Sequence, residues 1–157
     1  MSIERVRDYF RPLGREGDIL EFPVSSATVE LAAQAVGVIP ARIAKTLSFL
    51  VDGVCVLIVA AGDAKIDNSK YKGFFHTKAK MLTQEQAREM TGHAVGGVCP
   101  FGIDNPAVTA YLDVSLRRFD TVYPAAGNAA SAVRLSCGEL DILSNSSGWI
   151  DVCKNWS

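Results

Sequence analysis

The feature that most restricts the fold is a pair of strand-forming runs around residue 52. The runs 45–51 and 54–61 are separated by Asp52-Gly53. An Asp-Gly pair between two apolar runs is a strong hairpin signal, because both residues accept the positive φ of a tight turn. The second run contains only aliphatic residues and one cysteine, which is typical of a central strand covered on both faces. We therefore expect a sheet with this hairpin near its centre.

Helix signals alternate with further strand signals along the rest of the chain. Apolar spacing and capping residues predict helices at 2–13, 26–36 with Ser26 as N-cap, 40–44, 68–74, 83–92 and 136–144. Short strands are expected at 18–24, 108–112, 119–123 and 132–135. The segment 149–152 is expected to be a short strand or a packed tail. Because hairpins and helices are interspersed, we expect a mixed α/β (α+β) fold with a strongly bent, mixed sheet surrounded by helices.

Length and composition limit the class of protein. A chain of 157 residues with 48% hydrophobic and 21% charged residues is typical of one globular domain, here residues 1–157. The N-terminal residues are charged, and the longest apolar run is far below the roughly 20 residues that span a bilayer. We therefore expect a cytoplasmic protein with no membrane partner. Four widely spaced cysteines and two histidines predict free thiols, with no metal and no cofactor.

A glycine-rich stretch, residues 96–102, is the first candidate for chemistry. Its sequence is Gly96-Gly97-Val98-Cys99-Pro100-Phe101-Gly102. Glycine allows close approach of a ligand or another backbone, and proline restricts the residue before it to extended geometry. Such a loop presents backbone N–H groups that suit a carbonyl or an oxyanion. The alternative is an ordinary tight turn.

Lys45 is the second candidate. In a strand that begins there, Lys45 shares a face with Leu47, Phe49 and Val51, so its ammonium lies at the mouth of an apolar surface. Removing this charge from water is costly unless an anion or several acceptors meet it. The alternative is a lysine that reaches solvent from the edge of the sheet.

Other residues qualify by type and position, each with a plainer alternative. Asp63 and Asp67 follow the central strand, although Asp67 also fits an N-cap and Asp63 a turn. His93 precedes the glycine loop and could act as acid, base or hydrogen-bond donor, or simply end a helix. Cys99 could be a nucleophile with His93 as base, but a small side chain in a pocket wall fits better. A second small-residue loop, residues 124–128, either lines the same cavity or is an ordinary turn.

A cluster of lysines lies between residues 64 and 82, where Lys65, Lys70, Lys72, Lys78 and Lys80 face a single acid. Aromatic residues are interleaved with them, so the segment could hold phosphates and stack on unpaired bases. The alternative is a solvated charged face. The net charge of −1 argues against general attraction to nucleic acid, and we expect no DNA partner.

Taken in order, four of these motifs resemble a known family. They are residues 42–47 around Lys45, Gly62-Asp63 with Lys65 and Asp67, the Gly-x-x-x-Pro run 96–100, and Val122-Tyr123 followed by Gly127. Over residues 5–142 the chain resembles the YbaK/ProX-type prolyl-tRNA editing domain, which is also found inserted in bacterial prolyl-tRNA synthetases. The resemblance implies a barrel-like sheet and a free-standing deacylase that hydrolyses mischarged aminoacyl-tRNA, typically proline tRNA.

The resemblance also implies roles. The lysine matching Lys45 positions the terminal adenosine and its phosphate, and the loop matching 96–100 holds the aminoacyl carbonyl. A hydroxyl of the terminal ribose assists the attack of water, so no side-chain nucleophile is needed. The cysteine-specific branch has a serine and an aspartate where this chain has Ala125 and Ala132, so cysteine specificity does not transfer simply. Cys99 stands where related chains often have serine or threonine.

The leading hypothesis is therefore deacylation of proline tRNA that carries a small uncharged amino acid such as Ala, Cys, Ser or Thr, with prolyl-tRNA synthetase as a candidate partner. The alternatives are a non-catalytic tRNA- or nucleotide-binding module and a cysteine hydrolase. The predicted residues are Lys45, Gly96 and Gly97 for catalysis; Val98, Cys99, Pro100, Phe101, Asp63, Asp67, His93, Ala125 and Gly127 for substrate binding; and Lys65, Lys70 and Lys72 for tRNA.

Overall fold

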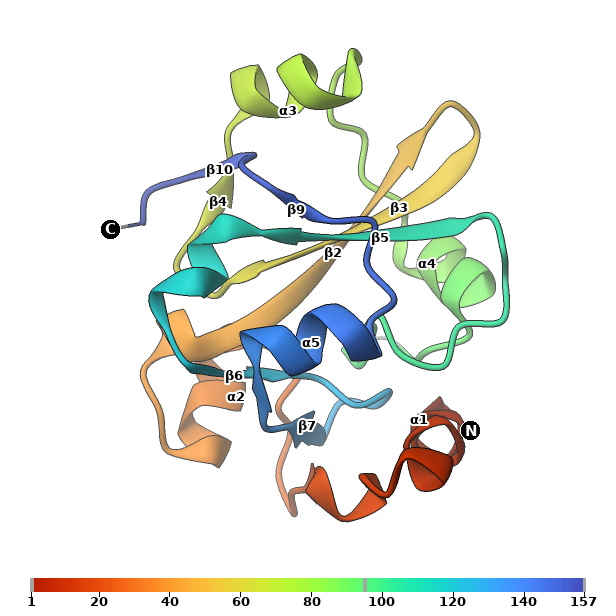
Figure 1. Cartoon of the computed structure of the whole chain (residues 1–157), viewed down its shortest axis with the longest axis vertical. Helices are drawn as coiled ribbons and strands as arrows, with labels where there is room; N and C mark the ends of the chain where they lie inside the picture. Colours follow the sequence, from red (N-terminus) through yellow and green to blue (C-terminus); the bar gives the residue numbers. More distant parts are fainter. Residues whose placement is uncertain (1, 95, 157) are drawn as a thin grey trace.

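A curled sheet organises the molecule, and its centre is the hairpin around residue 52 (Figure 1). The structure, a computed structural model, describes residues 2–94 and 96–156. The α-helices in this part of the chain are α1 (Ser2–Phe10), α2 (Val29–Val36), α3 (Asn68–Phe75), α4 (Gln84–Thr91) and α5 (Cys137–Leu143). The 3₁₀ helices are η1 (Arg11–Leu13), η2 (Glu16–Asp18), η3 (Pro40–Arg42) and η4 (Val114–Arg118). The strands are β1 (Ile19–Glu21), β2 (Ile43–Val51), β3 (Val54–Ala61), β4 (Lys65–Ile66), β5 (Val108–Asp113), β6 (Thr121–Pro124), β7 (Ser131–Val133), β8 (Leu135–Ser136), β9 (Trp149–Ile150) and β10 (Cys153–Lys154).

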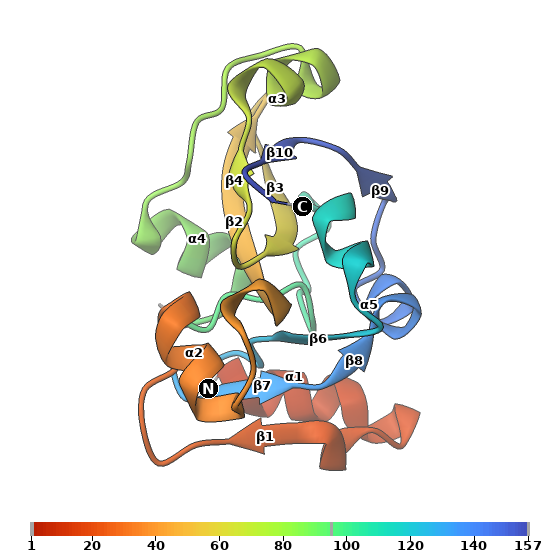
Figure 2. The ribbon, with the colours of Figure 1, turned by 90° about the vertical axis from the view of Figure 1, so that its left-hand side faces the viewer.

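The main sheet is mixed, as predicted. Its strand order is β8-β6-β2-β3-β5-β9, with β2–β3 and β6–β8 antiparallel and the other neighbours parallel. Two further antiparallel sheets of two short strands each, β1–β7 and β4–β10, accompany the main sheet. Strand β6 crosses the direction of the hairpin at a steep angle in Figure 2, so the sheet closes around part of its own core.

Strand β3 is covered on both faces, as its apolar sequence predicts. Cys55 and Leu57 pack in a small cluster that includes Met90 of α4. Val56 and Ile58, which point the other way, belong to the main core. In Figure 2, α4 lies on one side of the hairpin while η4 and α5 lie on the other. The hairpin turn at Asp52-Gly53 has positive φ at both residues, 49° and 81°, which is the geometry that an Asp-Gly pair tolerates.

Several predicted boundaries are confirmed by caps. Asp67 caps α3, and capping boxes open α4 at Thr83 and α5 at Ser136. Glycines in the left-handed conformation end α2 and α4, at Gly37 and Gly92.

Three local predictions were wrong in detail. Thr28 caps α2 by accepting from Leu31 N, while the hydroxyl of the predicted cap, Ser26, is buried and accepts from Ser131 N at 3.1 Å. The strand predicted at 18–24 is limited to Ile19–Glu21, since Pro23 has no N–H to continue the ladder. The segment 40–44 forms only a 3₁₀ turn, because β2 already begins at Ile43.

None of the helices in the described part of the chain has the length and apolar character needed to cross a lipid bilayer.

Candidate active site

A cavity of about 250 Å³ opens between β2, the N-terminal end of α2, the segment before α4 and the two small-residue loops. Lys45 and Leu47 of β2, Gly96 and Val98 of the glycine loop, and Ala125 of the second loop all line it. The tertiary structure thus brings Ala125 to the same cavity as Lys45, 80 residues earlier in the chain. Whether the second loop reaches the same cavity as the glycine loop was open from the sequence; Ala125 does.

Lys45 is the only charged residue among the described residues that line this cavity. The remaining lining residues are apolar, including Met81, or carry neutral hydroxyl, amide or phenol groups. A carboxylate, an imidazole or a thiolate is the usual general base or nucleophile, and none of these groups is found in the described lining. The cavity therefore suits an uncharged group beside an anion, held by one cation and by main-chain groups.

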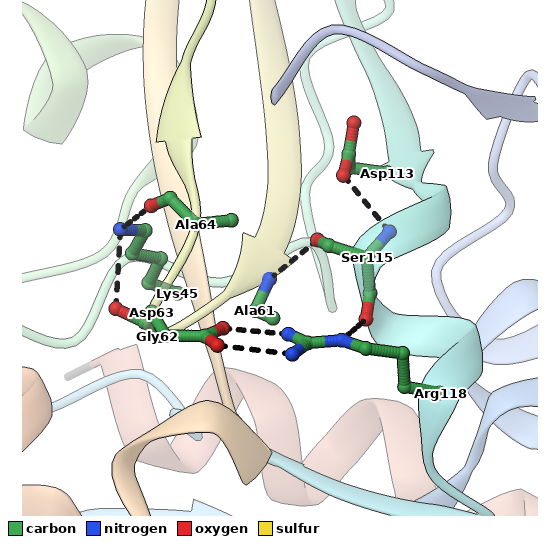
Figure 3. A network of polar contacts seen from close by, with 8 residues as sticks. All are labelled: Lys45, Ala61, Gly62, Asp63, Ala64, Asp113, Ser115 and Arg118. Carbon is green, nitrogen blue, oxygen red and sulfur yellow. Dashed lines mark hydrogen bonds and ion pairs between the residues drawn. The ribbon is translucent and has the colours of Figure 1, made fainter. Parts of the chain in front are cut away.

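The ammonium of Lys45 is held by main-chain carbonyls. The register of the hairpin places Lys45 opposite Ala60, so its half-buried side chain reaches the 62–64 turn that follows β3. Its Nζ donates to Gly62 O at 3.4 Å and to Ala64 O (Figure 3). Within the described residues, no carboxylate lies at ion-pair distance from this Nζ. Burial lowers the pKa of Lys45, and the nearby Asp63 carboxylate opposes that shift.

An ammonium has three N–H donors, and two acceptors are in place. The positive charge is therefore oriented by neutral groups but not neutralised by them. A partly desolvated cation in that state attracts an anionic or strongly polarised oxygen more strongly than a solvated one does.

The glycine loop presents only part of itself to the cavity. Gly96, with φ of 83°, and Val98 line the cavity, whereas Gly97 lies against the second loop. A Cβ on Gly97 would lie 2.2 Å from Asn128 N, so only glycine fits this backbone-to-backbone contact. The N–H of Gly97, predicted to donate to the substrate carbonyl, donates instead to Ala94 O, just before the loop, at 2.9 Å.

The rest of the predicted loop residues lie behind the cavity wall. Cys99 and Phe101 are fully buried, and Phe101 packs edge-on against Phe10 at 5.2 Å between ring centroids. Pro100 lines a different cavity. Gly127, which belongs to the second loop and has φ of 104°, is buried. These residues shape the wall from behind and do not face the cavity.

Cys99 and His93 do meet, with 3.6 Å between Sγ and Nε2. However, His93 Nε2 is 2.7 Å from Phe101 O, an interaction that requires Nε2 to be the protonated nitrogen. Burial lowers the pKa of His93 and raises the pKa of Cys99 to about 12. Both side chains are fully buried, so a neutral thiol beside a neutral imidazole cannot reach a substrate. This geometry argues against the cysteine-hydrolase alternative.

The two candidate acids have other partners. Asp67 accepts from Ser69 N at 3.0 Å and Lys70 N at 3.1 Å, which is the N-cap alternative, and these bonds lower the pKa of its carboxyl. The carboxylate of Asp63 pairs with Arg118, which lowers the pKa of Asp63. Neither aspartate is among the described residues that line the cavity.

The three predicted tRNA-contacting lysines lie outside the cavity and differ in their surroundings. Lys65 and Lys72 are exposed, and Lys72 borders a separate recess with Lys78. Lys70 instead pairs with Asp151 at 3.0 Å and donates to Cys153 O at 3.1 Å.

Sequence reasoning missed two parts of the site. The segment before α4 forms a wall of the cavity because Leu82 N donates to Ser48 O at 3.1 Å, which lays it along β2. The capping box at Thr83 marked the helix but carried no sign of the cavity. Arg118 was also missed, since an arginine in a polar segment has no local signal for a partner 55 residues away.

In the described residues, no cluster of three His, Cys, Asp or Glu side chains has the arrangement that could hold a metal ion.

The comparisons with known proteins bear on the family. The model of the aminoacyl-tRNA editing domain matches residues 24–142, which include Lys45 and both loops. The chain belongs to this family.

Two relatives and one solved structure show the extent of the similarity. The chain is 54% identical over 158 residues to the uncharacterized protein YwhH of Bacillus subtilis (strain 168), covering 99% of each. It is 36% identical over 74 residues to the proline–tRNA ligase of Lysinibacillus sphaericus (strain C3-41), a match of 46% of this chain and 13% of the ligase. A crystal structure described as a candidate trans-editing enzyme for prolyl tRNA synthetase superposes with a TM-score of 0.86 at 31% identity, covering 98% of this chain and 97% of that chain.

Proposed function

We propose that this editing-domain protein hydrolyses the ester of mischarged aminoacyl-tRNA, with proline tRNA carrying a small uncharged amino acid as substrate. The observation that carries the proposal is the cavity with one carbonyl-held cation, Lys45, and otherwise uncharged walls. The similarity to prolyl-tRNA ligases and to a candidate trans-editing enzyme supports proline tRNA as the carrier and prolyl-tRNA synthetase as a partner.

In this mechanism Lys45 holds the terminal nucleotide of the tRNA through its phosphate. The Gly96 end of the glycine loop lies against the aminoacyl carbonyl, and the small residues Val98 and Ala125 limit the side chain that fits. Water attacks the carbonyl carbon, the bond to the ribose oxygen breaks, and the proton from water ends on that oxygen. A neighbouring hydroxyl of the terminal ribose assists this transfer.

An aminoacyl ester is already activated, so holding it correctly and stabilising the oxyanion supply much of the acceleration. This requirement fits a cavity whose described lining has no general base. Outside the cavity, the exposed Lys65 and Lys72 are proposed to contact the acceptor stem, with Lys70 joining them when its pairing with Asp151 opens.

The test incubates the purified protein with proline tRNA carrying Ala, Cys, Ser or Thr and follows the loss of the ester. Wild type is expected to deacylate at least one of them, and Lys45→Ala to lower kcat/KM by about 10²–10³-fold, as removal of one key electrostatic donor does. Lys154→Ala, an exposed lysine outside the cavity, is the matched control. Salt-sensitive tRNA binding without hydrolysis of any substrate would instead identify a non-catalytic tRNA-binding module.

A further inference from the structure

Arg118 forms a two-point ion pair with Asp63 beside the 62–64 turn. Its two terminal nitrogens lie 2.9 and 2.6 Å from the two carboxylate oxygens. The Nε atom donates to Ser115 O at 2.9 Å, and the guanidinium lies over the rings of Phe119 and Trp156. The Arg118 side chain is only 17% exposed, so the pair is better shielded than a typical surface ion pair.

The same short helix, η4, holds the turn at a second point. The hydroxyl of Ser115 accepts from Ala61 N at 3.1 Å, while Ser115 N donates to Asp113 Oδ2 at 2.9 Å. Asp113 is fully buried, and its other oxygen accepts from Val152 N at 2.9 Å. The turn is therefore tied to η4 on both sides of Gly62, through Ala61 and through Asp63 (Figure 3).

Gly62 is held from the opposite side as well. A Cβ at this position would lie 2.1 Å from Pro40 O, so the backbone of η3 presses directly on the turn. The carbonyls of Gly62 and Ala64 are the groups that hold Lys45 Nζ. Asp63 lies between these two carbonyls in the chain, so a shift of its backbone away from Arg118 would also shift the acceptors of the ammonium.

We propose that Asp63 and Arg118 are positioning residues for Lys45, which hold the 62–64 turn so that its carbonyls fix the ammonium at the cavity wall. Neither residue contacts the substrate in this scheme. The inference rests on the proposed function for its consequence in catalysis, but the position and titration of Lys45 can be measured without any substrate.

The pKa of Lys45 distinguishes this positioning role from simple structural support. The ionisable groups that act on Lys45 are Asp63, Lys65, Cys153 and Glu30. Asp63→Asn removes a negative charge, so the pKa of Lys45 falls. Arg118→Gln leaves the Asp63 carboxylate uncompensated, so the pKa of Lys45 rises. The two variants thus displace the turn alike but shift the titration of Lys45 in opposite directions.

The experiment compares Asp63→Asn, Arg118→Gln and the double variant. Each single change is expected to lower kcat/KM by about 10–100-fold, because displacement of a positioned group by 1 Å can cost about 100-fold. The double variant should lose no more than the worse single variant, since the two residues share one interaction. The alkaline limb of the pH profile should move to lower pH in Asp63→Asn and to higher pH in Arg118→Gln.

Asp18→Asn is the control, because it removes a 3.0 Å pair with Arg15 that does not border the cavity, and it should leave kcat/KM and the pH profile unchanged. Lys45 is followed separately by ¹³C NMR of its ε-carbon, assigned with Lys45→Arg. Opposite shifts of this titration support the inference even where wild type proves inactive, in which case only the proposed function fails. Unchanged kcat/KM, or a loss accompanied only by a lower Tm with no shift in the Lys45 titration, would overturn the inference.

Discussion

The wall that carries Lys45 and the wall formed by the glycine loop are held in place by different interactions. On the Lys45 side, two carbonyls orient a cation, and a partly shielded arginine–carboxylate pair holds the turn that supplies them. On the loop side, Gly97 touches the backbone of residue 128 with no room for a side chain. The first wall depends on charge, so it should respond to pH and salt. The second wall depends on a glycine, because a side chain at position 97 would overlap the backbone of residue 128. Substitutions should therefore fail in different ways on the two sides.

The largest effect is expected from Gly97→Ala, which tests the loop wall. A Cβ there meets Asn128 N at 2.2 Å and Gly127 C at 2.4 Å, so one of the two loops has to move. Overpacking of this kind costs about 1–3 kcal/mol, and the shifted loop should remove deacylation as well. Urea denaturation and ester hydrolysis are the two measurements. Normal stability and activity of this variant would show that the contact between Gly97 and Asn128 leaves room for a Cβ, against the expectation.

Lys45→Met tests the other wall, with nearly the same volume and no charge. We expect kcat/KM to fall by about 10²–10³-fold, while the free energy of unfolding changes by less than about 1 kcal/mol. Activity would thus be lost without loss of fold, the reverse of the steric failure at Gly97. The same urea and hydrolysis measurements decide it, and Lys45→Arg tells whether any cation suffices.

Cys99→Ala should affect stability only. Cys99 is fully buried behind the loop, and removal of its sulfur leaves a small void that costs about 1–2 kcal/mol. With its pKa raised to about 12, the thiol should also resist alkylation in the native protein at pH 8. Hydrolysis rates within threefold of wild type are expected; a large loss with a trapped thioester would restore the cysteine nucleophile.

The smallest effect is a pH dependence that comes from His93. Burial lowers the pKa of His93 below its ordinary 6.5, so the unfolded chain takes up a proton first as the pH falls. Stability contributed by this residue is complete above pH 6.5 and is lost as the pH falls from there towards the lowered pKa. In His93→Gln the amide can still donate to Phe101 O. We expect the urea midpoint of this variant to depend less on pH, between pH 7 and pH 5, than that of wild type. If the midpoint of the variant depends on pH as strongly as that of wild type, another residue is responsible for the pH dependence.

Much of the fold could be predicted because its signals are local. The Asp52-Gly53 turn, the capping boxes at Thr83 and Ser136 and the apolar run of β3 each act within a few residues, and each is confirmed. The missed cap at Ser26 shows the limit of such reasoning. Its hydroxyl is bound by Ser131, a partner 105 residues away that no local pattern reveals.

The candidate site divides in the same manner. The sequence was enough to place Lys45 on an apolar strand face, although β2 begins two residues earlier, at Ile43, and to place a glycine loop at residues 96–102. Side-chain alternation and backbone freedom are properties of neighbouring residues. Tertiary packing brings Gly96, Val98 and Ala125 to one cavity with Lys45. It also buries Cys99 and His93 together and pairs Asp63 with Arg118. These outcomes depend on how the sheet curls, because burial and long-range pairing arise from residues far apart in the chain.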